Sequence, residues 1–187
     1  MNILKILLIS LAAAFSENAI FSKYLGAELL FEETKSTKEA LSAGLAITVL
    51  TTVTSFLTCL VETLLLRPFS VEYMRTPTFV LVMAAVFGFA LMLSRKKGRA
   101  SSCIFSGTAV LGTALMVSTN GLGIFGAIVY GLFAGVGYTV SAFLFAEIRS
   151  RLRYSEVPKF FEGLPILLIT AGLIALAFTG FSGMKFI

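Results

Sequence analysis

The sequence predicts an all-α integral membrane protein with six transmembrane helices. Of its 187 residues, 57% are hydrophobic and 13% are charged, and the mean hydropathy is +0.94. A soluble domain carries about 25% charged residues, so we expect one membrane domain over 1–187 without a soluble domain. Residues 100–146 include no charged side chain. As a single helix they would extend roughly 70 Å, over twice the hydrocarbon core of a bilayer, so this stretch must fold back on itself.

A turn in the uncharged stretch is predicted at 119–123, where two glycines lie beside Asn120. The predicted spans after the first are 40–61 continuing to Leu66, 76–94, 100–118, 122–146 and 163–184. Each of them is long enough to cross a bilayer. Pro77 and Pro165 fall in first helical turns, where proline is tolerated.

The N-terminal segment allows two interpretations. Lys5, the apolar run 6–15 and three alanines at 12–14 resemble a cleavable signal peptide. However, Lys5 is the only basic residue before the run, and apolar residues resume at Ala19. We therefore expect a first span that continues through Glu17 and Asn18, which brings the total to six.

Basic residues gather on one side of this predicted topology. Since cytoplasmic loops are enriched in lysine and arginine, we expect that side to be cytoplasmic and both termini to lie outside. This side carries Lys35, Lys38, Arg95, Lys96, Lys97, Arg99, Arg149, Arg151, Arg153 and Lys159, whereas the other carries Arg67, Arg75 and Lys185. The net charge of +5 is explained by basic residues in cytoplasmic loops, so it does not indicate nucleic-acid binding.

The two halves of the chain, about 1–97 and 98–187, resemble each other weakly. The string 17–21 aligns with 107–111, and Pro77 aligns with Pro165 at nearly the same offset. Each half contains three predicted spans, so the chain crosses the membrane three times before the second half begins on the opposite side. The two halves must therefore have opposite orientations in the membrane. Inverted repeats place their functional site near the membrane midplane, where interrupted helices meet. We expect the first and fourth helices to be interrupted.

The candidate midplane polar site comprises Glu17, Asn18 and Thr108. An ionisable group at that depth costs about 2.5 kcal/mol or more unless it faces protein or water. Glu17 can therefore be an ion or proton site, or a cap on a helix break without a transport role. Glu62 and Glu147 lie near the ends of the two long spans, where both are expected to reach an interface.

Several chemistries are excluded or weakly supported by composition. Histidine and tryptophan are absent, and all 10 acidic residues are glutamates, which excludes histidine-based metal or haem sites. Cys59 and Cys103 both fall in apolar segments and are expected to be inert thiols. No nucleophile–base pair, phosphate loop or dinucleotide fingerprint identifies an enzyme. The GxxxG string at 131–135 indicates close helix packing, within the chain or with a partner.

Several short sequence segments resemble those of a known protein family. They are 129–131, 134–137, 148–152 and 157–158 around the fifth span, 168–173, 175–178 and 180–183 in the sixth, 73–76 and 79–82 in the third, and 17–18 and 25–26 in the first. In these strings the chain resembles the small six-span membrane subunits of the Rnf and Nqr electron-transport complexes, in particular the RnfA-type subunit.

The resemblance implies a subunit of an ion-translocating, Rnf-type ferredoxin–NAD oxidoreductase complex in the bacterial inner membrane. It implies a homologous six-helix partner in the opposite orientation and further subunits that carry flavin and iron–sulfur centres. It also implies a [2Fe-2S] cluster bound by cysteines of the first and fourth helices. The matching positions here are Glu28 and Thr108. Because thiolates suit such clusters and a threonine hydroxyl does not, we expect this chain to hold no cluster in the family's way.

Two other functions remain open at this point. A stand-alone secondary transporter with inverted repeats would use the interrupted helices and Glu17 as a solute or ion site. A purely structural assembly subunit would need no site at all. The favoured function is a non-catalytic or electron-conducting subunit that helps form the transmembrane path for electrons or ions.

Overall fold

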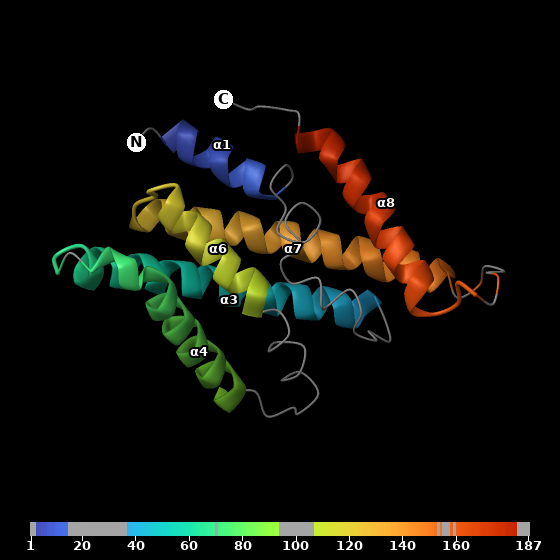
Figure 1. Ribbon diagram of the computed structural model, residues 1–187, viewed down its shortest axis with the longest axis horizontal. Helices are drawn as coiled ribbons and strands as arrows, with labels where there is room; N and C mark the ends of the chain where they lie inside the picture. Colours follow the sequence, from blue (N-terminus) through green and yellow to red (C-terminus); the bar gives the residue numbers. More distant parts are fainter. Residues whose placement is uncertain are drawn as a thin grey trace.

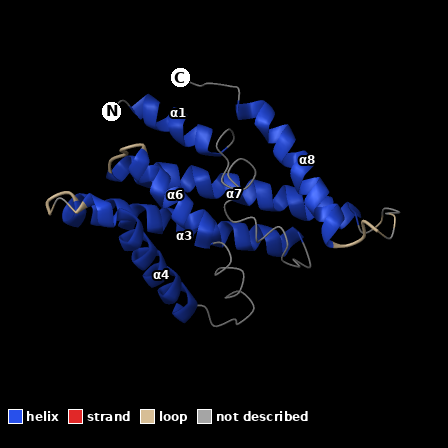
Figure 2. Cartoon of the chain, viewed as in Figure 1, coloured by secondary structure: helices blue, strands red, loops and turns tan. Residues whose placement is uncertain are grey.

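The computed structural model describes residues 3–14, 37–69, 71–93, 107–152, 154, 158 and 160–182. Within these ranges all regular structure is helical, as the sequence predicts (Figure 2). The helices are α1 (Ile3–Ala14), α3 (Thr37–Val61), α4 (Arg75–Leu93), α6 (Gly107–Thr119), α7 (Ile124–Leu152) and α8 (Leu164–Ser182). A π-helical turn, η1 (Glu62–Leu66), continues α3, and a short 3-10 helix, η2 (Glu72–Met74), precedes α4.

Three described helices are long and apolar enough to cross a membrane: Ala40–Leu66, Arg75–Met92 and Ile124–Leu152. They confirm the predicted second, third and fifth spans, and the fifth continues past the uncharged run to Leu152. The sixth span corresponds to α8, whose apolar part, Leu164–Gly180, is shorter. The described part of the fourth span is α6, with 13 residues. Residues 100–106 and 15–36 lie outside the described ranges, so the interruptions of the fourth and first helices stay predictions.

The predicted turn within the uncharged stretch is confirmed between α6 and α7. Gly121 has φ +60°, a left-handed conformation that glycine adopts at little cost. The amide of Leu122 donates to the carbonyl of Val117 at 3.3 Å, and the amide of Gly121 donates to Ser118 at 3.0 Å. This pair of hydrogen bonds is the Schellman motif, which ends a helix at such a glycine. Leu122 is 3% exposed and anchors the turn in the core.

The long helices α3 and α7 form the centre of the molecule and lie side by side (Figure 1). A Cβ atom on Gly135 would lie 2.6 Å from Thr48 Cα, and one on Gly44 would lie 3.0 Å from Thr139 Cα. As the contacts advance along α3 they move back along α7, so the two helices are antiparallel. The GxxxG pair Gly131 and Gly135 therefore packs within this chain, against α3.

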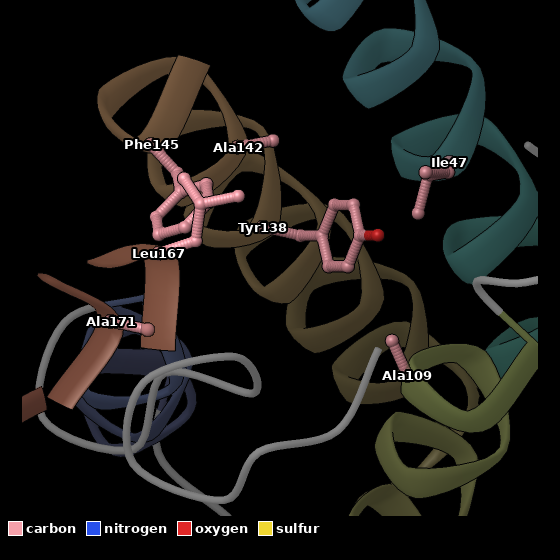
Figure 3. Packing of buried hydrophobic residues seen from close by; sticks show 7 residues of the cluster. All are labelled: Ile47, Ala109, Tyr138, Ala142, Phe145, Leu167 and Ala171. Carbon is pink, nitrogen blue, oxygen red and sulfur yellow. The ribbon is translucent and has the colours of Figure 1, made fainter. Parts of the chain in front are cut away.

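The remaining helices cover this central pair. α1 contacts α7, and α6 contacts α3. One buried cluster joins α8 to α7, and Figure 3 shows Tyr138 directed from α7 toward Ile47 of α3. A second cluster joins Ala13 of α1 to Cys59 of α3 and Tyr130 of α7. In Figure 1, α4 and α8 diverge from the ends of α3 and α7.

Candidate functional site

The structure describes one residue of the predicted midplane site. Thr108 is the second residue of α6, and its side chain is exposed. Glu17 and Asn18 lie outside the described residues, as does Glu28 at the other family ligand position. The convergence of Glu17, Asn18 and Thr108 therefore remains a prediction.

The first turn of α6 is held on one side by α4. A Cβ atom on Gly107 would lie 3.7 Å from Met83 Cε and 3.8 Å from Met83 Sδ. One turn further along, Val110 is 0% exposed and belongs to a cluster with Phe87 of α4 and Leu50 of α3. This packing fixes the backbone from which the Thr108 side chain projects.

The donor atoms at the family's ligand positions do not fit a thiolate-bound [2Fe-2S] cluster. Thr108 offers a hydroxyl group, and position 28 is a glutamate. The free thiol of Cys59 is buried at the other end of the α3–α6 contact, with its Sγ 3.6 Å from the backbone oxygen of Leu122. Cys103 lies outside the described ranges. Among the described residues, no group of three or more His, Cys, Asp or Glu side chains can hold a metal ion.

An ion pair with a buried carboxylate closes the turn between α3 and α4. Glu62, the first residue of η1, is 4% exposed. Its Oε1 lies 3.0 Å from Nη2 of Arg75, the first residue of α4, and 3.9 Å from Nη2 of Arg67. The expectation that Glu62 reaches an interface stays a prediction; within the chain its carboxylate is buried beside these two arginines. A carboxylate at the end of a span, with an arginine on each side of the following turn, is the sequence signal that indicates this pair.

Hydroxyl groups line the contact between the long helices. We call the α3 residues Thr48, Thr51 and Ser55, together with Thr139 of α7, the hydroxyl seam. The Oγ1 atoms of Thr48 and Thr139 are 3.0 Å apart, and Thr51 Oγ1 donates to the carbonyl of Gly131 at 3.2 Å. Ser55 Oγ would lie 3.0 Å from a Cβ atom on Gly131.

Two hydroxyl groups of α3 are buried and make no hydrogen bond within the described part of the chain. Thr54 and Ser55 are both 0% exposed. Among the described residues, neither Thr54 Oγ1 nor Ser55 Oγ has a hydrogen-bond partner. Four other hydroxyls of α3, at positions 48, 51, 52 and 58, instead donate to a carbonyl of the preceding turn, as Thr58 does to Thr54 at 2.8 Å. Neither residue was predictable from the sequence as a buried hydroxyl without a partner, because serine and threonine are common in membrane helices.

The fold defines a class: a multi-pass helical membrane protein built on two antiparallel long helices, with paired charges and hydroxyls in its interior. The sequence model of one protein family, described as "Rnf-Nqr subunit, membrane protein", matches residues 6–185. The chain therefore belongs to the Rnf-Nqr membrane-subunit family, as the resemblance in its spans predicts.

Curated relatives match over nearly the full chain. The chain is 37% identical to the A-type subunit of the Na(+)-translocating ferredoxin:NAD(+) oxidoreductase complex of Acetobacterium woodii, over 96% of this chain and 98% of the relative. It is 37% identical to the A-type subunit of the ion-translocating oxidoreductase complex of Azoarcus sp., over 95% and 96%. The corresponding protein from Vibrio cholerae is 36% identical, over 95% and 96%.

Proposed function

We propose that this chain is the RnfA-type subunit of an ion-translocating oxidoreductase complex of the ferredoxin:NAD type, in a bacterial inner membrane. The observation that carries the proposal is the match to the A-type member of such a complex across 96% of this chain and 98% of the relative. Identity spread along the whole chain supports a shared role better than a local motif would. The chain would help form the transmembrane path for electrons or ions.

The arrangement of the helices supports two inverted repeats within this protein. The two long helices, one from each half, are antiparallel along the hydroxyl seam. The short helix of the first half, α1, lies against the long helix of the second, and α6 of the second half lies against α3 of the first. Inverted repeats related by an axis in the membrane plane produce this exchange of contacts. In this proposal Thr108, at the start of α6, belongs to the midplane site with Glu17 and Asn18.

The proposed partners are a homologous six-helix subunit in the opposite orientation and subunits that carry flavin and iron–sulfur centres. The loop charges support outside termini and a cytoplasmic face rich in arginine and lysine. Within this chain, the proposed role of the described residues is structural and electrostatic. Tight packing at Gly131 and Gly135 holds the two halves together, and the Glu62–Arg75 pair compensates a charge inside the membrane.

A stand-alone secondary transporter is the second candidate. The observation that favours it is the donor set at the family's ligand positions, a carboxylate at 28 and a hydroxyl at 108 in place of two thiols. In such a transporter the polar site with Glu17 would bind a solute or ion directly.

Affinity purification from native membranes distinguishes the two functions. A tag on this chain is expected to recover subunits with bound flavin and iron–sulfur centres, and ferredoxin-dependent NAD reduction in the recovered material. An unrelated tagged membrane protein of the same host controls for carry-over. Recovery of this chain without flavin or iron, from membranes in which it transports an ion, would instead support the transporter.

A further inference from the structure

Glu62 is a buried carboxylate to which the proposed function gives no role beyond charge compensation. It lies within the membrane-spanning segment Ala40–Leu66 and is 4% exposed. A charge buried in a membrane is costly without a partner, and Glu62 forms ion pairs with Arg75 and Arg67. The shorter pair, at 3.0 Å, joins the end of α3 to the first residue of α4.

Little of α4 is buried within this chain, apart from Phe79 and Phe87. Only 11% of its apolar segment is buried in this chain. Leu81, Phe89 and Met92 are exposed over 70%, 68% and 88% of their surfaces. Because so little of α4 is covered, an ion pair at its first residue has a large share in determining where the helix stands relative to α3.

The buried side of α4 contacts the first turn of α6. Met83 lies against Gly107, and Phe87 lies in one cluster with Val110. A change in the position of α4 therefore moves the side chains that support the backbone at Gly107 and Thr108. The two residues of the ion pair are remote in sequence from this turn but are connected to it by one helix.

We propose that Glu62 and Arg75 are positioning residues for the N-terminal turn of α6, and that they act through α4. The importance of that turn rests on the proposed function, since the turn carries the family ligand position Thr108. The positioning itself is a property of this chain and is measured without reference to activity.

Chemical crosslinking in membranes tests this proposal on the full chain. Met83→Cys and Gly107→Cys are combined in a background that carries Cys59→Ala and Cys103→Ser, and a short bifunctional thiol reagent joins the two cysteines. A reference pair, Thr48→Cys and Thr139→Cys, reports on the α3–α7 contact, where the two hydroxyl oxygens are 3.0 Å apart.

We expect Glu62→Gln and Arg75→Gln each to lower the rate of 83–107 crosslinking by about tenfold, while the reference pair changes by less than about twofold. Arg75→Lys keeps the positive charge and should recover a large part of the rate. Arg67→Gln is the matched control: Arg67 reaches the same carboxylate oxygen, at 3.9 Å, but is not part of α4. It should leave both rates nearly unchanged.

Three results would overturn the proposal. The first is an 83–107 rate that Glu62→Gln and Arg75→Gln leave at the starting level. The second is an equal loss in the reference pair, which would assign Glu62 a general role in folding. The third is a loss in Arg67→Gln as large as in Arg75→Gln. A failure of the proposed function would appear in the purification experiment and would leave these rates unaffected.

Discussion

Thr48 of α3 and Gly135 of α7 approach so closely that a Cβ atom on Gly135 would lie 2.6 Å from Thr48 Cα. A side chain cannot be inserted at that separation unless the two backbones move apart. The contact lies in the hydroxyl seam, beside the Thr48–Thr139 oxygen contact of 3.0 Å. The contact between the two halves of the chain therefore depends on glycines without side chains, and Gly135 is the tightest of them.

Gly135→Ala should destabilise the protein by about 1–3 kcal/mol, because overpacking forces backbone shifts. Thermal unfolding in detergent, followed by circular dichroism, measures the loss. Gly172→Ala in α8 is the matched control, since a Cβ atom there would meet nothing within 4 Å. Equal midpoints for the two variants would contradict the close contact.

The positions of the long spans were predictable because local patterns determine them. Uncharged runs and the first-turn proline Pro77 indicate α3, α4 and the start of α7 within a few residues, whereas α7 ends six residues after its uncharged run. The partner of the GxxxG pair was left open, since helix pairing depends on residues remote in sequence. The ion pair of Glu62 was not predicted for the same reason, since it depends on how the turn brings Arg75 to the carboxylate. The candidate site was predictable only as a set of positions, of which Thr108 is described.

Gly121→Ala should cost about 1–2 kcal/mol, because an L-residue is strained in the left-handed region. Gly121 has φ +60° at the end of α6, where its amide and that of Leu122 complete the Schellman motif. Gly121→Asn should be milder, since asparagine tolerates this conformation. Gly123→Ala is the control in the same turn: it has open space for a Cβ atom and no positive φ. A larger loss in Gly123→Ala than in Gly121→Ala would refute this interpretation of the turn.

The Glu62–Arg75 pair should show coupling in a double-mutant cycle. Arg75→Gln alone leaves a buried carboxylate without its nearest partner and should destabilise by about 1–3 kcal/mol, less than for a fully buried pair because the Arg75 side chain is 33% exposed. Glu62→Gln with Arg75→Gln removes both charges and should lose less than the sum of the single variants. Unfolding midpoints of the four proteins give the coupling. If the losses of stability in the two single variants simply added up in the double variant, the interaction between Glu62 and Arg75 would contribute nothing to stability.

Replacing Thr54, whose hydroxyl has no hydrogen-bond partner within the described part of the chain, should not lower the stability of the protein. Thr54→Val replaces a hydroxyl that has no partner among the described residues with a methyl group of similar size. Removing a buried, unpaired polar group should leave stability unchanged or raise it by about 1 kcal/mol. Thr51→Val is the contrasting variant, because Thr51 Oγ1 donates to Gly131 across the hydroxyl seam at 3.2 Å. It should destabilise by about 1 kcal/mol. If Thr54→Val were the more damaging of the two, the Thr54 hydroxyl would have a partner in the membrane.

Thr108→Val tests whether the family ligand position of this chain binds iron. Thr108 is exposed at the start of α6, and a hydroxyl is a poor ligand for an iron–sulfur cluster. We therefore expect the variant complex to keep the iron and acid-labile sulfide content and the electron paramagnetic resonance spectrum of the unmodified complex. Ser118→Ala in the same helix serves as a control for nonspecific loss of subunits. A loss of iron and sulfide equal to one cluster in Thr108→Val, but not in Ser118→Ala, would show that a cluster depends on this hydroxyl. The cluster would then be bound without the two thiolates of the family.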